Sequence, residues 1–164
     1  MFVYGHRGFS GKYPENTMLA FEEAYKVGAD GIETDVHMSS DGKLVIIHDE
    51  LLERTTGRKG VVSDYTGDEL VKMNAGMTKE NSFGFTPIPR FEEFCEYWAK
   101  NGFIVNVEIK TNNTWYRGLE EKVWDTVRHY HLENKVIFSS FNWLSCVRMK
   151  QLAPEVPCGL LYEN

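Results

Sequence analysis

Short apolar runs alternate along this chain with segments that carry a helical pattern of apolar residues, and this alternation limits the possible folds. Four of the runs lead into charged or imidazole side chains: 2–4, 31–32, 44–47 and 103–105. Apolar runs of this length between helical segments are typical of buried parallel strands. Polar groups at the carboxyl ends of such strands lie where α/β proteins place their chemistry. The sequence therefore predicts an α/β fold with a site assembled from several strand ends.

The same pattern gives the approximate bounds of each element. Strands are expected at 2–6, 31–36, 43–48, 103–109, 136–140 and 158–162. Helices are expected from 16 to about 28, and at 90–100, 115–131 and 143–152. In the first of these, Asn16 is the expected N-cap and Gly28 is expected to end the helix. Residues 54–86 interrupt the alternation, because they are rich in Gly, Thr, Asp and Lys and have no long apolar run. We expect a surface insertion there, with at most a short helix near 66–75.

The composition is that of one globular domain, 1–164, and it argues against several classes of function. The hydrophobic content is 42% and the charged content 26%, which is ordinary for a soluble domain. A net charge of -6 argues against nucleic-acid binding. No apolar run approaches the roughly 20 residues that span a bilayer. A strand-like run at the N-terminus argues against a signal peptide, and three separated cysteines predict reduced thiols in the cytoplasm.

Strand alternation gathers acidic side chains at the predicted site. Residues two apart share a face, so Glu33 and Asp35 point the same way, as do Glu108 and Lys110 on a later strand. Three carboxylates in a low-dielectric setting repel one another unless they are protonated or neutralised. A divalent cation would resolve this conflict, and an all-oxygen ligand set favours Mg²⁺ or Ca²⁺ over zinc. The alternative is that the acids are solvated loop residues.

Two histidines complete the predicted chemistry. His6 and His48 end different predicted strands and could face each other across a substrate. Two imidazoles that titrate near neutrality can divide a displacement, one removing a proton and the other donating one. The alternative for each is a structural histidine. His37 is placed on the face opposite Glu33 and Asp35 and is left out of the site.

Cationic side chains beside these residues suit a phosphate group. Arg7 follows His6 directly, and its planar guanidinium matches two phosphate oxygens, while Lys110 offers a point charge. Either cation could instead form an ordinary ion pair with a neighbouring acid. Glu15 begins the first helix, where it could bind the helix terminus or orient His6 or Arg7.

A series of motifs resembles the glycerophosphodiester phosphodiesterase family and spans most of the chain. The matching segments are G-H-R-G at 5–8, P-E-N-T at 14–17, G-A-D-G-I-E-T-D-V at 28–36, S-D-G at 40–42, H-D-E-L-L-E-R-T-T-G at 48–57, V-E-I-K at 107–110 and S-S-F-N at 139–142. The resemblance implies a (β/α)₈ barrel of the TIM-barrel type, in which 54–86, after the third strand, helps to cover the site. The implied site consists of His6 and His48 as the acid–base pair, Glu33, Asp35 and Glu108 as metal ligands, and Arg7, Lys110, Glu15 and Phe141 around the substrate.

The resemblance also implies an activity, the metal-dependent hydrolysis of glycerophosphodiesters to glycerol 3-phosphate and an alcohol. Two alternatives stay open: a related phospholipase-type phosphodiesterase with cyclic phosphate products, and a non-catalytic phosphodiester-binding fragment. The resemblance implies eight strands, whereas the pattern here ends after about six, and a complete barrel takes about 250 residues. We therefore expect open edges at the first and last strands. We expect one of three outcomes: a homodimer that completes the barrel, a piece of a longer protein, or a weakened enzyme.

Overall fold

One sheet organises the protein, whose computed structural model describes residues 1–163. Within these residues the sheet has six strands: β1 (Tyr4–His6), β2 (Gly31–Met38), β3 (Leu44–Ile46), β4 (Ile104–Ile109), β5 (Val136–Ser140) and β6 (Cys158–Leu160). The order is β1-β2-β4-β5-β6, each parallel to its neighbour, and β3 pairs with β2. The structure confirms the predicted α/β class and the position of every predicted strand to within a few residues.

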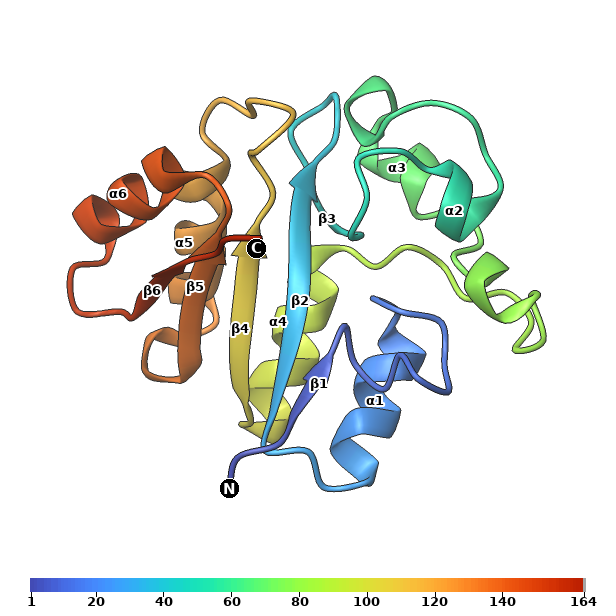
Figure 1. Cartoon of the computed structure of the whole chain (residues 1–164), viewed down its shortest axis with the longest axis horizontal. Helices are drawn as coiled ribbons and strands as arrows, with labels where there is room; N and C mark the ends of the chain where they lie inside the picture. The colour runs from blue at the N-terminus through green and yellow to red at the C-terminus, as the bar shows by residue number, and fades with distance from the viewer. Residues whose placement is uncertain (164) are drawn as a thin grey trace.

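The longer helices lie on one side of the curved sheet, and the other face is turned toward the viewer in Figure 1. They are α1 (Met18–Lys26), α4 (Phe91–Asn101), α5 (Leu119–His129) and α6 (Trp143–Leu152). Their apolar residues meet those of the strands in one core, in which Phe21, Phe94, Trp98 and Phe138 are fully buried. This one-sided cover leaves the other face of the sheet free of the longer helices.

The ends of α1 differ in one respect from the prediction. Thr17, not Asn16, is the N-cap, and its side chain accepts a hydrogen bond from the amide of Ala20 at 3.3 Å. Gly28 follows the last helical turn with a φ of 84°, as expected for a glycine that ends a helix. The correction frees the side chain of Asn16 for a different contact, described below.

The third strand was predicted as parallel, and this prediction is wrong. β3 runs antiparallel to β2, with Val36 opposite Ile46 and Met38 opposite Leu44. A turn of five residues, 39–43, joins the two strands, and a parallel connection needs about a dozen residues or more. The chain therefore returns along β2, and the amide of Ile47 donates to the carbonyl of Asp35 at 3.2 Å. His48 thus reaches the level of Asp35 on a returning hairpin rather than at the end of a parallel strand.

Residues 54–86 contain more helix than the sequence predicted. Besides α3 (Gly67–Leu70), the region has α2 (Glu53–Thr56) and the short 3-10 turns η1 (Val62–Asp64) and η2 (Met77–Lys79), and a further 3-10 turn, η3 (Glu133–Lys135), precedes β5. A second apolar cluster lies between this segment and the β3 hairpin, formed by Val45, Ile47, Leu52, Val62, Leu70, Met73, Ala75 and Ile88. The segment is therefore anchored by a small core of its own beside the site.

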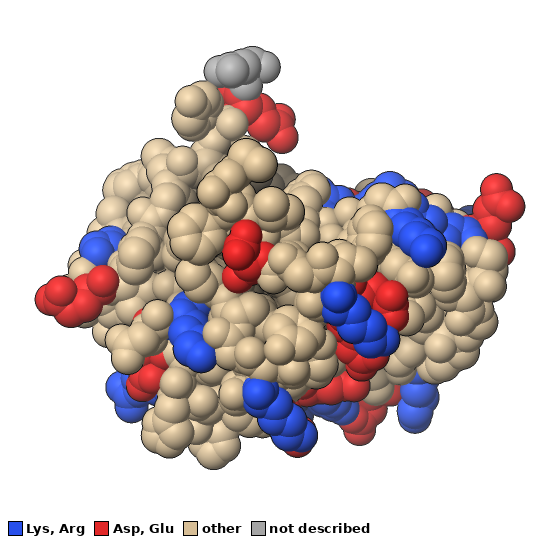
Figure 2. Space-filling model, turned by 90° about the horizontal axis from the view of Figure 1, so that it is seen from below, with Lys and Arg blue, Asp and Glu red and all other residues tan. Residues whose placement is uncertain are grey.

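The two ends of the strand order are open among the described residues, as expected. β1 and β6 each pair with a strand on one side only. Apolar side chains are exposed at both edges, including Phe2 and Val3 at one and Leu160 and Tyr162 at the other. On the face seen from below, acidic and basic side chains are interspersed among large uncharged areas (Figure 2). In the described part of the chain, no helix combines the length and apolarity that crossing a bilayer requires.

Candidate active site

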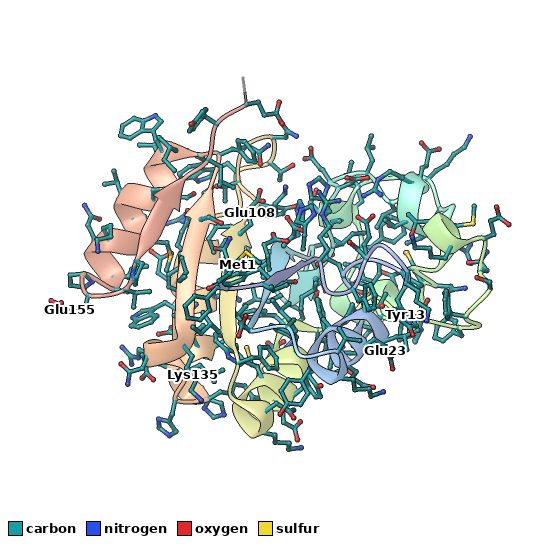
Figure 3. All side chains as sticks on the ribbon, turned by 60° about the horizontal axis from the view of Figure 1, so that its bottom comes forward. Met1, Tyr13, Glu23, Glu108, Lys135 and Glu155 are labelled. Carbon is teal, nitrogen blue, oxygen red and sulfur yellow. The ribbon has the colours of Figure 1, made fainter. Side chains whose placement is uncertain are left out.

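Three carboxylates meet in the middle of the fold. Glu33 and Asp35 come from β2 and Glu108 from β4, where Asp35 is the register partner of Glu108. One oxygen atom of each lies within 4.8 Å of the others. Figure 3 shows the labelled Glu108 in the interior, whereas Lys135 and Glu155 lie at the periphery. The alternation of the two strands therefore gathers these acids as the sequence predicted.

Burial and mutual repulsion shift the pKa values of the carboxylates in this cluster. Burial, and then the charge of Asp35, raise the pKa of Glu33 to about 8. The same two causes raise the pKa of Glu108. Asp35 is fully buried, and its Oδ1 atom has no hydrogen-bond partner. The cluster therefore holds mutually repelling carboxylates and one buried oxygen without a donor.

Two cationic side chains border the carboxylates. The Nζ atom of Lys110 lies 2.8 Å from Oε1 of Glu108 and 3.5 Å from Oδ1 of Asp35. The Nε atom of Arg7 lies 3.7 Å from the other oxygen of Asp35, Oδ2, and this Nε atom has no hydrogen-bond partner. Both cations therefore lie against the carboxylate cluster.

Asn16 is a residue of this cluster that sequence reasoning missed. Its Nδ2 atom donates to Oδ2 of Asp35 at 2.8 Å, and its Oδ1 accepts from the hydroxyl of Thr34 at 3.0 Å. Both Arg7 and Asn16 have a positive φ, 57° and 54°, which is uncommon for residues other than glycine. Strained backbone of this kind gathers at functional sites. In the sequence Asn16 is only an N-cap candidate, and no local pattern indicated its contact with Asp35.

His48 is oriented by its neighbour in the sequence. Its Nδ1 atom lies 2.6 Å from Oδ1 of Asp49. Partial burial opposes the charge of Asp49, but hydrogen bonds from Arg54 and His48 outweigh it and lower the pKa of Asp49 to about 2. An ionised carboxylate accepts a hydrogen bond from Nδ1–H, which leaves Nε2 of His48 to exchange protons.

His37 was predicted to face away from the acids, and this prediction is wrong. β2 stays regular through Met38, so that residues 33, 35 and 37 share a face. The His37 ring is buried, with Nδ1 3.0 Å from the hydroxyl of Tyr116 and Nε2 3.1 Å from the carbonyl oxygen of His48. The alternation that identified Glu33 and Asp35 was also the signal for His37.

His6 is more exposed than His48, whose side chain is 29% exposed. The side chain of His6 is 70% exposed, and its Nε2 lies 3.7 Å from Oε2 of Glu33. Partial burial and the charge of Arg7 lower the pKa of His6, and the charge of His48 acts in the same direction. His6 and Glu33 line an open hollow of about 440 Å³ together with Tyr4, Asn106 and Ile137. The imidazole is therefore next to the acidic cluster and open to solvent.

A second cavity, of about 470 Å³, is lined by a different set of residues. It is lined by His37, His48, Asp49, Glu50, Leu51, Lys110, Asn112, Asn113, Thr114, Phe141 and Glu163. His48, Lys110 and Phe141, which were predicted on separate grounds, thus meet at one cavity. His6 lines the first hollow and not this one.

Glu15 belongs to a chain of ion pairs at the edge of the site. It accepts a hydrogen bond from Nη1 of Arg7 at 2.9 Å. It also accepts two from Arg54, at 2.6 and 2.8 Å. Burial opposes its charge, but the bonds from Arg54 and Arg7 outweigh it and lower the pKa of Glu15. Of the roles considered for Glu15, the structure supports the orientation of Arg7, and it adds Arg54 as a second partner.

Comparison with known proteins links this geometry to named relatives. A glycerophosphodiester phosphodiesterase of Caldanaerobacter subterraneus is 44% identical over 161 residues, covering 98% of this chain and 66% of its own. A crystal structure of a glycerophosphodiester phosphodiesterase from Agrobacterium tumefaciens matches with a TM-score of 0.87 and 32% identity over 96% of this chain and 65% of its own. A phosphodiesterase from Oleispira antarctica, solved in complex with the product sn-glycerol-3-phosphate, matches with a TM-score of 0.82 and 34% identity over 98% and 65%.

These matches settle the fold type and the family. The chain spans 65–66% of the length of these relatives. The structural likeness confirms the predicted (β/α)₈ TIM-barrel type, of which the described strands form a part. The family model for the glycerophosphoryl diester phosphodiesterases matches residues 6–164. With nearly the whole sequence matched, the chain belongs to the glycerophosphoryl diester phosphodiesterase family.

Proposed function

We propose that the chain hydrolyses glycerophosphodiesters to glycerol 3-phosphate and an alcohol, with a divalent cation, Mg²⁺ or Ca²⁺, held by Glu33, Asp35 and Glu108. The observation that carries this proposal is the convergence of the three carboxylates within 4.8 Å, bordered by Lys110 and Arg7. Membership of the family, and the product bound in the Oleispira enzyme, support this choice of substrate.

The donor set fits a hard cation. All three side chains offer carboxylate oxygens, the ligands that Mg²⁺ and Ca²⁺ prefer. Burial and mutual repulsion raise the pKa of Glu33 and Glu108, and Oδ1 of Asp35 is buried without a donor. When bound, the cation would polarise a phosphoryl oxygen and neutralise the developing charge.

The two flanking cations would hold the phosphate. Arg7 presents a planar guanidinium and Lys110 a compact ammonium, the two kinds of donor that bind phosphate oxygens. Glu15 would orient Arg7 through the hydrogen bond to Nη1. Phe141, on the wall of the 470 Å³ cavity, would lie beside the substrate, and residues 54–86 would cover the site from the side of α2.

His6 and His48 would divide the proton transfers. One imidazole takes the proton of the attacking oxygen as it bonds to phosphorus, and the other gives a proton to the alcohol oxygen as its bond to phosphorus breaks. His48 is the better oriented of the two, because Asp49 holds Nδ1. His6 is exposed beside Glu33, and bound substrate would fill the space between it and the cavity of His48.

An assay for glycerol 3-phosphate tests the proposal directly. Glycerophosphodiesters would be incubated with the protein in Mg²⁺, in Ca²⁺ or in EDTA, and the product measured with a coupled enzyme. We expect release that requires a cation. Full activity in EDTA would refute the role of the metal. Cation binding without turnover would favour the alternative of a phosphodiester-binding fragment, and a cyclic phosphate in phosphorus NMR would favour the phospholipase-type reaction.

We propose further that a second copy of the chain pairs with the open strand edges and completes the barrel. β1 and β6 offer unpaired strand edges in the described residues, and apolar side chains such as Val3 and Leu160 are exposed there. Unpaired edges of this kind recruit further strands. Sedimentation velocity tests the point: a dimer is expected, and a fully active monomer would contradict it.

The cysteines support a reducing compartment, and we propose the cytoplasm. Cys95, Cys146 and Cys158 are all free thiols. Burial raises the pKa of Cys95, so this thiol stays protonated and unreactive. Fractionation of the cells that make the protein would check the location.

A further inference from the structure

Arg54 connects two parts of the site that are distant in the sequence. It lies in α2, at the start of the 54–86 segment. Its Nε atom is 2.5 Å from Oδ2 of Asp49. Its two terminal nitrogens bind both oxygens of Glu15, at 2.8 and 2.6 Å. One planar guanidinium therefore holds two carboxylates at once, one of them in a paired two-bond arrangement.

Each of these carboxylates holds a residue that the proposed function uses. The other oxygen of Asp49 binds Nδ1 of His48 at 2.6 Å. Oε1 of Glu15, besides its bond to Arg54, binds Nη1 of Arg7 at 2.9 Å. A continuous series of charged hydrogen bonds thus runs from His48 through Arg54 to Arg7.

The geometry explains why this series needs an arginine. The fork of Arg54 reaches Asp49 with one nitrogen and Glu15 with the other two, and a lysine ammonium has no such planar arrangement. The short bonds keep both acids ionised, and an ionised Asp49 stabilises the tautomer of His48 that carries its hydrogen on Nδ1. The free Nε2 is then the nitrogen that can accept or donate a proton at the substrate.

We propose that Arg54 is a positioning residue: by fixing Asp49 and Glu15 together, it sets the tautomer of His48 and the direction of the Arg7 guanidinium. This inference rests on the proposed function for its effect on turnover. Its effect on the His48 ring is independent of any reaction. The competing explanation is that Arg54 only anchors residues 54–86 and contributes to stability alone.

The test compares Arg54→Gln and Arg54→Lys with the control Arg58→Gln. Arg58 lies exposed in the same segment, and its side chain forms no ion pair in residues 1–163. Long-range proton–nitrogen NMR at pH 8 reports the tautomer of each histidine, and the signal of His48 is assigned from its loss in His48→Gln. The melting temperature of each variant is measured on the same samples. The values of kcat and KM are then measured over a range of pH at a temperature well below the melting temperature.

We expect the Nδ1-protonated form of His48 to dominate in the wild type and in Arg58→Gln, and to lose population in Arg54→Gln. Turnover of Arg54→Gln should fall about tenfold to a hundredfold, in keeping with the cost of misplaced catalytic groups. The kcat of Arg54→Lys should be intermediate, and its pH profile should be altered in shape.

Two results would overturn the inference. An unchanged His48 tautomer in Arg54→Gln would do so whatever the activity. A lowered melting temperature with a normal kcat and pH profile would also do so, because it would leave Arg54 only as an anchor. A shifted tautomer in a protein whose wild type has no turnover would support the positioning role while refuting the proposed function.

Discussion

The Nε2 atom of His37 lies 3.1 Å from the backbone carbonyl oxygen of His48. Because a carbonyl oxygen can only accept, Nε2 carries the hydrogen, and Nδ1 accepts from the hydroxyl of Tyr116 at 3.0 Å. Burial lowers the pKa of His37 to about 4, so the ring is neutral at pH 7. This one ring joins the hairpin that carries His48 to the segment that follows β4.

The variant Tyr116→Phe is expected to weaken this connection, because it removes the hydroxyl that binds His37. The buried Nδ1 atom of His37 would lose its donor, which should lower the free energy of unfolding by about 1 kcal/mol and reduce turnover severalfold. Urea titration and steady-state kinetics measure the two effects. The control is Tyr130→Phe at the end of α5, because the Tyr130 ring packs on His129 and its hydroxyl has no hydrogen-bond partner among residues 1–163. Equal losses in both variants would contradict the prediction.

Removal of either proposed acid–base residue should abolish most turnover and spare metal binding. We expect His6→Ala and His48→Ala to lower kcat by about 10²- to 10⁴-fold, the usual contribution of general acid–base catalysis. The rise in melting temperature on adding Mg²⁺ or Ca²⁺ should persist in both. His129→Ala, in α5, serves as the control. Near-normal rates in both site variants would show that the assignment is wrong.

Loss of one carboxylate should weaken the metal site first. In the wild type, a cation at a hundred times its Kd should add about 2.7 kcal/mol to the free energy of unfolding. In Glu108→Gln this gain should shrink, because one charged ligand is gone, while Glu96→Gln, at an exposed ion pair with Lys100, should keep it. Titration of the melting temperature with each cation checks this. An undiminished gain in Glu108→Gln would remove Glu108 from the ligand set.

The stability that Asp49 contributes should depend on pH in a defined direction. Its pKa in the folded state is about 2, below the value of about 3.9 in an unfolded chain. A carboxyl with a lowered pKa stabilises the fold above the unfolded value and loses this contribution as the pH falls through the folded value. Asp49→Asn should therefore cost about 1 to 2 kcal/mol at pH 7, and the difference from the wild type should shrink below pH 4. Urea titrations in EDTA at several pH values measure this, and a difference independent of pH would be inconsistent with it.

The sequence predicted the acidic cluster because strand geometry is regular. Glu33 and Asp35 lie two apart on β2, and Glu108 lies on the next strand of the sheet at the register position of Asp35. The same alternation places His37 on this face, because residues 33, 35 and 37 lie two apart on one regular strand.

Other features could be read only in part. Five residues between β2 and β3 are too few for a parallel crossover. The length of this turn alone is therefore enough to predict an antiparallel hairpin. The bonds of Arg54 to Glu15 join residues 39 positions apart. The ion-pair partner of an exposed arginine depends on how the loops pack. No local sequence pattern predicts that partner. Asn16 likewise has the composition of an N-cap, and only the tertiary contact with Asp35 reveals its other role.

The short turn from Ser39 to Lys43 constrains how this chain can vary. The hydroxyl of Ser39 accepts from the amide of Lys43 at 2.8 Å, and the turn sets the register of all that follows. One added residue would turn every side chain of the returning strand to the other face, and Ile47 would then take the place of the His48 imidazole. The turn itself must therefore keep its length. Insertions and deletions can accumulate in the segment after the hairpin, where a longer or shorter loop would change the shape of the cavity around the substrate.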